Sequence, residues 1–180
     1  MKRLTLVFVL VALSGCGSLL RAPLRDGQEA SLTLDDRWRP LEEIVERPRV
    51  FQDLGSSSVI TTIGRYCYVR DLDEWVRAHP AGISFDSILR HEQEHARRQI
   101  STGTWLWVAH YAYDKDFAWD EEKIGYYYQI TMLKNAGQSV NVDGIALALS
   151  KYKNLAGQIV NFEDARAWIV EVLAGRWTPS

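Results

Sequence analysis

Two histidines four residues apart, in a segment with the apolar spacing of a helix, restrict the fold of this chain more than any other feature. The segment Ser84–Gln99 contains His91 and His95, with Glu92 directly after the first histidine. Residues four apart in a helix lie on one face, one turn apart, so both imidazoles can bind one metal ion. These histidines border the apolar stripe of the predicted helix, where burial requires a polar partner, and a metal ion is such a partner.

The residue types around the histidines favour zinc and hydrolytic chemistry. A catalytic Zn²⁺ has three protein ligands and one position open to water. A carboxylate next to the ion can take a proton from that water. We therefore expect His91 and His95 to be two ligands of Zn²⁺ and Glu92 to be a general base.

The third ligand has to come from elsewhere in the chain. Glu121 and Glu122 lie on a predicted helix downstream of the histidines. Glu122 has Ala118 four residues before it and Gly125 three residues after it, and such small residues let a helix approach a metal closely. We favour Glu122 over Glu121 for this reason, and both over His110, which lies in an aromatic segment where histidines more often pack as ring side chains.

The N-terminus has the pattern of an export signal. Lys2 and Arg3 precede the apolar run Leu4–Leu13, which is too short to cross a bilayer as a helix. The run continues into Ser14-Gly15-Cys16, which resembles the lipobox of bacterial lipoproteins. We therefore expect residues 1–15 to be a signal peptide and Cys16 to carry acyl chains that anchor the protein to a membrane. An ordinary secretory signal with an incidental cysteine is the alternative.

The residues after Cys16 indicate a tethered domain in an exported protein. In lipoproteins of Gram-negative bacteria, a residue other than Asp after the cysteine, here Gly17, implies the outer membrane, facing the periplasm. Residues 16–36 are predicted to be a tether and residues 37–180 a single domain. The 21 basic and 23 acidic residues provide no electrostatic case for binding nucleic acid. Cys67 would be the only free thiol, and we expect it to be a buried apolar residue in a strand.

The order of predicted elements indicates an α+β fold, with a small β element followed by a mostly helical core. Strands are expected at Val59–Ile63 and Tyr66–Val69 because β-branched and aromatic residues alternate there. Helices are expected at Leu41–Glu46, Asp71–Ala78, Ser84–Gln99, Trp105–Asp114, Phe117–Ala136, Val142–Ala156 and Phe162–Ala174. Ser84 and Asn161 are candidate N-caps, and Gly137 and Gly175 are candidate C-terminal stops.

A family resemblance covers residues 84–129, about a quarter of the chain. It is carried by His91–His95, Gln99, Tyr111, the sequence Glu122-Lys-Ile-Gly125-Tyr126, and Gln129. This pattern resembles small bacterial metallopeptidases of the gluzincin kind, which read His-Glu-x-x-His…Gln…Tyr…Glu-x-x-Ala-Tyr. The resemblance implies a zincin-like core, with Zn²⁺ bound by His91, His95 and Glu122 and with Glu92 as base. The chain departs from the pattern at Gly125, where Ala is usual.

The expected activity is zinc-dependent hydrolysis of a peptide bond in a peptide or protein substrate. An extended substrate could pair with one of the two predicted strands at a sheet edge. A tetrahedral oxyanion also needs a stabiliser, and the candidates are Tyr126, Tyr127, Tyr128, His110 and Arg97. The alternative is a non-catalytic, membrane-tethered binding module in which the metal is structural or absent. The chain has none of the motifs of the common cell-wall amidases.

Overall fold

The computed structural model describes residues 30–47 and 60–180 of the chain. The predicted signal peptide, Cys16, residues 16–29 of the predicted tether and Val59 lie outside these ranges. In chain order the elements are β1 (Ser31–Thr33), the 3₁₀-helix η1 (Asp36–Trp38), β2 (Glu43–Glu46), β3 (Thr61–Ile63), β4 (Tyr66–Val69), α2 (Leu72–Ala78), α3 (Ile83–Thr102), α4 (Thr104–Tyr113), α5 (Lys115–Asn135), α6 (Val142–Ser150), β5 (Lys153–Asn154), β6 (Gly157–Gln158) and α7 (Phe162–Leu173).

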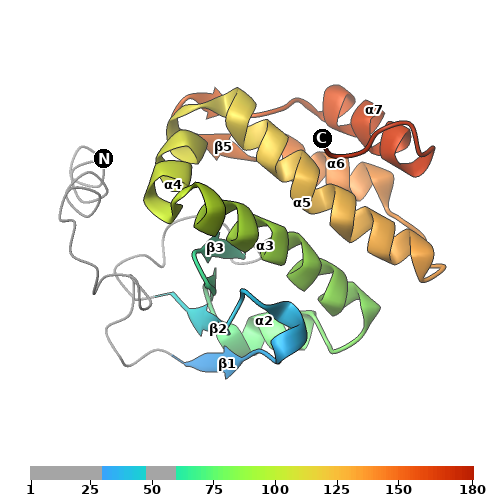
Figure 1. Ribbon diagram of the computed structural model, residues 1–180. Coiled ribbons are helices and arrows are strands. Elements are labelled where there is room, and N and C mark those ends of the chain that lie inside the picture. The colour runs from blue at the N-terminus through green and yellow to red at the C-terminus, as the bar shows by residue number, and fades with distance from the viewer. Residues whose placement is uncertain (1–29, 48–59) are drawn as a thin grey trace.

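Four short strands form a mixed sheet in the order β1-β2-β4-β3. The central strands β2 and β4 are parallel, and the edge strands β1 and β3 pair antiparallel to them. In Figure 1 the sheet and α2 lie on one side of α3, while α5 runs back alongside α3 on its other side and is followed by α6 and α7. The predicted α+β, mostly helical fold is therefore confirmed.

The predicted helix at Leu41–Glu46 is wrong, because residues 43–46 form the central strand β2. Ile44 and Val45 are completely buried there, and β-branched residues suit a strand with neighbours on both sides. β2 pairs with β1 and β4, so its partners come from residues before and after it in the chain.

The predicted tether overlaps the sheet, because β1 lies at residues 31–33. All three of its side chains are exposed, so β1 has no apolar pattern for sequence analysis to detect. Backbone hydrogen bonds hold the segment in place. The amide of Leu34 donates to the carbonyl of Glu42 at 2.8 Å, and the amide of Glu46 donates to the carbonyl of Ala30 at 2.9 Å.

The predicted helix Val142–Ala156 is wrong in its second half. Helix α6 ends at Ser150, and a short hairpin of β5 and β6 follows. At its turn, the Asn154 side chain accepts a hydrogen bond from the amide of Ala156 at 2.9 Å. This local bond favours a turn over a helix, and Gly157 adopts a positive φ of 120°.

The helix termini agree with the expected caps in most cases. Asn161 caps α7 through its side chain, and Gly137 follows α5 with a positive φ of 71°. Helix α3, however, begins at Ile83 with Gly82 as its N-cap residue, so Ser84 lies inside the helix and is not the cap.

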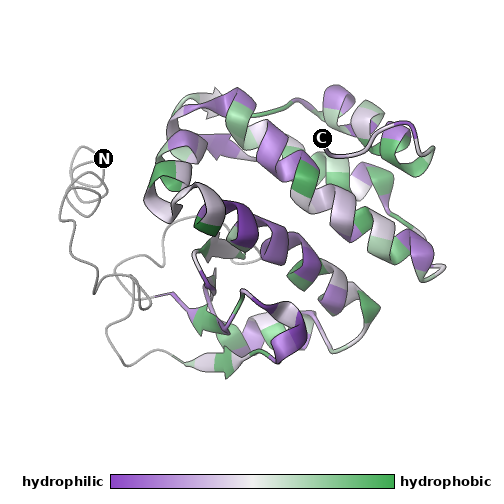
Figure 2. Ribbon diagram, viewed as in Figure 1, coloured by the Kyte–Doolittle hydropathy of each residue, from purple (hydrophilic) through white to green (hydrophobic). Residues whose placement is uncertain are grey.

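The described residues form three hydrophobic clusters, and the two larger ones lie on opposite sides of the contact between α3 and α5. One joins the sheet, α2 and one face of α3, and includes Ile44, Cys67 and Leu89. The other joins α5, α6 and α7, and includes Ile130 and Ile169. The middle of α3 is hydrophilic although the helix lies between these layers (Figure 2). Cys67 is free and completely buried in β4, as expected.

No helix within residues 30–47 and 60–180 combines the length and the apolar character that crossing a membrane requires.

Candidate metal centre

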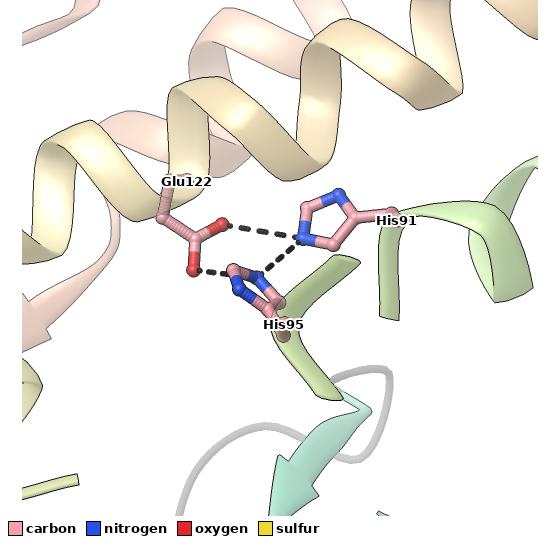
Figure 3. A group of neighbouring side chains, drawn as sticks. All are labelled: His91, His95 and Glu122. Carbon is pink, nitrogen blue, oxygen red and sulfur yellow. Dashed lines mark hydrogen bonds and ion pairs between the residues drawn. The ribbon is translucent and has the colours of Figure 1, made fainter. Parts of the chain in front are cut away.

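Two helices bring three side chains together at the contact between the cores. His91 and His95 extend from successive turns of α3, and Glu122 extends towards them from α5 (Figure 3). The Nε2 atoms of the two imidazoles are 2.9 Å apart, and each lies 3.6 Å from an oxygen of Glu122. The residues are only 5%, 6% and 3% exposed, respectively. They form a buried group that could hold a metal ion.

The spacing and chemistry of these side chains fit a divalent metal ion. Ligand atoms about 2.1 Å from a tetrahedral ion lie about 3.4 Å from one another, and the observed separations are 2.9 and 3.6 Å. Imidazole nitrogen and carboxylate oxygen are both zinc ligands. Within the described ranges, Oε2 of Glu122 and Nδ1 of His95 are buried without hydrogen-bond partners. Such atoms are destabilising when unpaired, and an ion would provide a partner for Oε2.

Gly125 allows α5 to approach α3 at this point. A Cβ atom on Gly125 would lie 2.6 Å from Nε2 and 2.7 Å from Cδ2 of His91. These separations are too short for van der Waals contact, so any larger residue would displace the imidazole ring. The glycine at position 125 is therefore matched to the close packing of His91 in this chain.

The structure separates Glu122 from the alternative ligand Glu121. Glu121 points to a different part of α3, where its two oxygens accept hydrogen bonds from Arg98 at 2.6 and 2.7 Å. Glu121 is 1% exposed, so this bidentate pair neutralises a buried carboxylate. Glu122 is the acid that meets His91 and His95, in agreement with the preference for Glu122 from the small residues around it.

Further side chains hold two of the three candidate ligands in place. The hydroxyl of Tyr111, on α4, donates to Oε1 of Glu122 at 2.5 Å. The side chain of Gln129, one turn after Gly125 on α5, forms a hydrogen bond with His91. Partners of this kind orient metal ligands and tune their basicity. Both residues are among those quoted for the sequence resemblance, although sequence alone assigned them no role.

Glu92 is held by the edge strand of the sheet. The hydroxyl of Thr62, on β3, donates to Oε2 of Glu92 at 2.6 Å. The same hydroxyl lies 3.3 Å from the thiol of Cys67 on β4. Since the only proton of the Thr62 hydroxyl is used for Glu92, the thiol is the donor in the second contact. This chain of donors favours the ionised form of Glu92.

Gln99 fastens the same strand to α3. Its side-chain oxygen accepts a hydrogen bond from the amide of Gly64 at 2.7 Å, and its side-chain nitrogen donates to the carbonyl of Thr62 at 2.8 Å. The β3–β4 hairpin is thereby fixed against the helix that carries both histidines and Glu92.

Burial keeps both imidazoles neutral in the metal-free protein. It lowers the pKa of His91 to about 4, an effect only partly opposed by the hydrogen bond with Gln129. Burial also lowers the pKa of His95, and the nearby His91 and Arg98 lower it further. Neutral imidazole is the form that binds metals, so neither imidazole has to lose its positive charge before it binds a metal ion at neutral pH.

Burial has the opposite effect on the two carboxyl groups. It raises the pKa of Glu92 to about 8, with a further increase from the charge of Glu122 and a decrease from the hydrogen bond of Thr62. It raises the pKa of Glu122 to about 7, against the hydrogen bond of Tyr111. Buried, shifted groups next to one another are typical of functional sites. Glu92 titrates near the pH at which a general base has to operate.

The five candidate oxyanion stabilisers lie in different surroundings. Tyr126 packs edge-on against His91, with ring centroids 4.5 Å apart. Tyr127 packs on Trp177, Tyr128 lies under Arg90, and Arg97 pairs with Glu94. His110 is exposed and rests against Phe117, so it does not join the cluster. Of the proposed oxyanion stabilisers, only Tyr126 contacts a candidate ligand.

Thr62 and Arg98 are partners of glutamates at the α3–α5 contact that sequence analysis did not identify. Thr62 lies 30 positions from Glu92, and Arg98 lies 23 positions from Glu121. Neither spacing follows a helix or strand period, so no local pattern relates the partners.

No protein-family model, no curated protein and no solved structure matches this chain. The arguments about its function therefore depend on the geometry of the centre.

Proposed function

We propose that this protein is a zinc-dependent peptide-bond hydrolase tethered to a membrane through an acylated Cys16. The observation that carries the proposal is the convergence of His91, His95 and Glu122, with Glu92 on the same helix and held from a second element. Two imidazoles and one carboxylate leave a fourth position for water, as catalytic zinc sites do.

Different residues have different roles in the proposed hydrolysis. Zinc, when bound, supplies Lewis acidity that lowers the pKa of water toward about 7. Glu92 accepts the proton of the attacking water and passes it to the leaving amine. Thr62 holds Oε2 of Glu92, which leaves Oε1 for this proton. β3 is an edge strand, and pairing with an edge strand is a common mode of peptide capture. The carbonyl of Thr62 is already occupied by Gln99, so a substrate would pair with other backbone groups of the strand.

A non-catalytic metal centre is the second candidate function. It is favoured by the burial of the three candidate ligands, which are at most 6% exposed. A structural zinc site has four protein ligands and no position for water. The coordination number of the loaded protein therefore separates the two functions.

Three substitutions test the hydrolase. Full-length zinc-loaded protein is incubated with a peptide library, and cleavage is read by mass spectrometry alongside zinc content. Glu92→Gln should retain zinc and lose at least about 100-fold of the cleavage rate, because only the base is removed. His91→Ala and Glu122→Gln should lose the metal.

One control accompanies these variants. Glu121→Gln should retain zinc, since Glu121 binds Arg98 and not the centre. Cleavage that survives in Glu92→Gln at the wild-type rate would contradict the mechanism. The anchor is tested separately by Cys16→Ala, which should abolish acyl incorporation and move the protein out of the membrane fraction.

A further inference from the structure

The two oxygens of Glu122 have different surroundings. Oε1 accepts the hydrogen bond from Tyr111 at 2.5 Å and lies 3.6 Å from Nε2 of His95. Oε2 is buried, lies 3.6 Å from Nε2 of His91, and has no hydrogen-bond partner within residues 30–47 and 60–180. Both oxygens therefore face an imidazole, but only Oε1 also has a protein donor, and a carboxylate held in this way is arranged to bind a metal through its unpaired oxygen.

We propose, on the basis of the metal binding in the proposed function, that Tyr111 is a positioning residue that makes Glu122 a one-oxygen ligand. Its hydroxyl occupies Oε1 and leaves Oε2 for the ion. Two imidazole nitrogens and one carboxylate oxygen then leave one tetrahedral position open. A two-oxygen Glu122 would fill the position that water requires.

The fold holds the phenol of Tyr111 firmly. Its ring stacks on Trp107, with centroids 4.9 Å apart and planes 18° from parallel. Trp107 in turn packs edge-on against His95 at 5.6 Å. The Tyr111 ring therefore shares one packed aromatic layer with a candidate ligand, which restricts its rotation.

The β5–β6 hairpin fixes the backbone of Tyr111. The side chain of Asn154 donates to the carbonyl of Tyr111 at 2.9 Å, and the amide of Leu155 donates to the carbonyl of Ala112 at 2.8 Å. The hairpin thus joins the end of α4 to the rest of the helical half. Its contribution to the centre passes through Tyr111.

In the part of the chain that the structure describes, no second phenol takes this role. The hydroxyl of Tyr126 lies 3.4 Å from that of Tyr152, so these two phenols pair with each other. Tyr113, two residues further on at the end of α4, is 55% exposed. Tyr113 therefore serves as a matched control on the same helix.

The test is metal binding by full-length Tyr111→Phe and Tyr113→Phe. Zn²⁺ affinity is measured by competition with a chromophoric chelator, and coordination is read from the visible spectrum of the Co²⁺-loaded protein. We expect Tyr111→Phe to weaken Zn²⁺ binding about 10- to 100-fold. Its Co²⁺ absorption should also weaken, because Glu122 becomes free to bind with both oxygens and five-coordinate Co²⁺ absorbs less than four-coordinate Co²⁺. Tyr113→Phe should match the wild type in both measurements.

The outcomes separate this inference from the hydrolase. Tyr111→Phe with unchanged affinity and an unchanged Co²⁺ spectrum would overturn the role of Tyr111. A wild-type protein that binds metal but cleaves nothing would overturn the hydrolase alone, and one that binds no metal would overturn both. If Tyr111→Phe does not fold, Asn154→Ala keeps the phenol but releases its backbone, and is expected to weaken Zn²⁺ binding about 2- to 10-fold. Unchanged affinity in that variant would then count against the inference.

Discussion

At the scale of single residues, the centre depends on one partner for each polar side chain. Thr62 holds Glu92, Tyr111 holds Glu122 and Gln129 binds His91. Buried polar groups that are paired in this way restrict the side chains to one arrangement. Two atoms of the centre are exceptions, Oε2 of Glu122 and Nδ1 of His95, and Oε2 faces the position where an ion would be bound.

Gly125 provides a test at this scale. Gly125→Ala places a Cβ atom 2.6 Å from Nε2 of His91, so the imidazole has to move. We expect Zn²⁺ affinity to fall at least about tenfold, measured by chelator competition. Ala favours the helix by about 1 kcal/mol, while overpacking costs about 1 to 3 kcal/mol. Because these two effects change the free energy of unfolding in opposite directions, Zn²⁺ affinity is the more informative measurement.

A second glycine supplies the control for this variant. Gly144→Ala also creates a close contact, in this case 2.5 Å from the side chain of Asn141 at the start of α6. Helix α6 does not contribute to the centre, so zinc affinity should be unchanged. Wild-type affinity in Gly125→Ala would show that the ring of His91 adapts and that the glycine is not required.

At the scale of elements, polar contacts join α3 to α5 at two levels. His91 and His95 meet Glu122, and Arg98 meets Glu121. The other face of α3 packs Leu89 and Ala96 against the sheet, and the far side of α5 packs in the second core. The distance between the helices is therefore set by polar partners that must match in position, and less by adaptable apolar packing.

Substitutions in the Arg98–Glu121 pair test whether polar partners determine the contact between α3 and α5. Arg98→Leu leaves the Glu121 carboxylate buried without its guanidinium partner. We expect the free energy of unfolding to fall by about 2 kcal/mol, below the value for a fully buried pair because the Arg98 side chain is 40% exposed. Urea denaturation of the zinc-free protein measures this change.

A double variant is the matched control. Arg98→Leu combined with Glu121→Leu removes both charges and should recover most of the lost stability, because no unpaired buried charge remains. A double variant less stable than Arg98→Leu alone would contradict this account of the contact.

At the scale of the whole molecule, the candidate metal centre joins two halves with separate cores. The ligands from α3 belong to the half with the sheet, and Glu122 belongs to the half with α6 and α7 (Figure 1). A ligand that binds only the folded state stabilises it. A metal ion at this point therefore stabilises the docking of the halves as well as the site itself.

The stability of the zinc-free protein should depend on pH through the buried carboxyl groups. The folded pKa values of Glu92 and Glu122 are raised to about 8 and about 7 from 4.5. The folded state therefore binds more protons than the unfolded state at neutral pH, and stability falls as pH rises through these values. His91, with its pKa lowered to about 4, has the opposite effect, but only below pH 6.5.

Above pH 6.5 only the effect of the carboxyl groups remains. Between pH 6.5 and 8.5 we expect a loss of about 2 kcal/mol, or about 4 to 8 °C in Tm. Excess Zn²⁺ should raise Tm more at pH 8.5 than at pH 6.5, because it binds the ionised Glu122. Calorimetry with and without Zn²⁺ measures both trends, and Glu122→Gln is the control, with a smaller pH dependence and no response to zinc. A Tm of the zinc-free protein that rises over this range would contradict the assignment.

Local patterns were sufficient where one element supplies all the relevant residues. The spacing of His91 and His95 on one helix, Asn161 as a cap and Cys67 in a buried strand are all correct. The wrong predictions concern segments whose secondary structure depends on residues distant in the sequence. Glu43–Glu46 is a strand because β1 and β4 flank it, and its short apolar run suits either a helix or a strand.

The sequence by itself determined the α+β class, the pairing of two histidines on one face of α3, and the preference for Glu122, because helical periodicity and small residues act over a few positions. Only the tertiary structure decided that Glu121 binds Arg98, that Thr62 holds Glu92, and that the β5–β6 hairpin supports Tyr111. These contacts join residues 23 to 43 positions apart. Their partners are selected by burial, which makes an unpaired polar group unfavourable, and burial exists only once the two halves have packed.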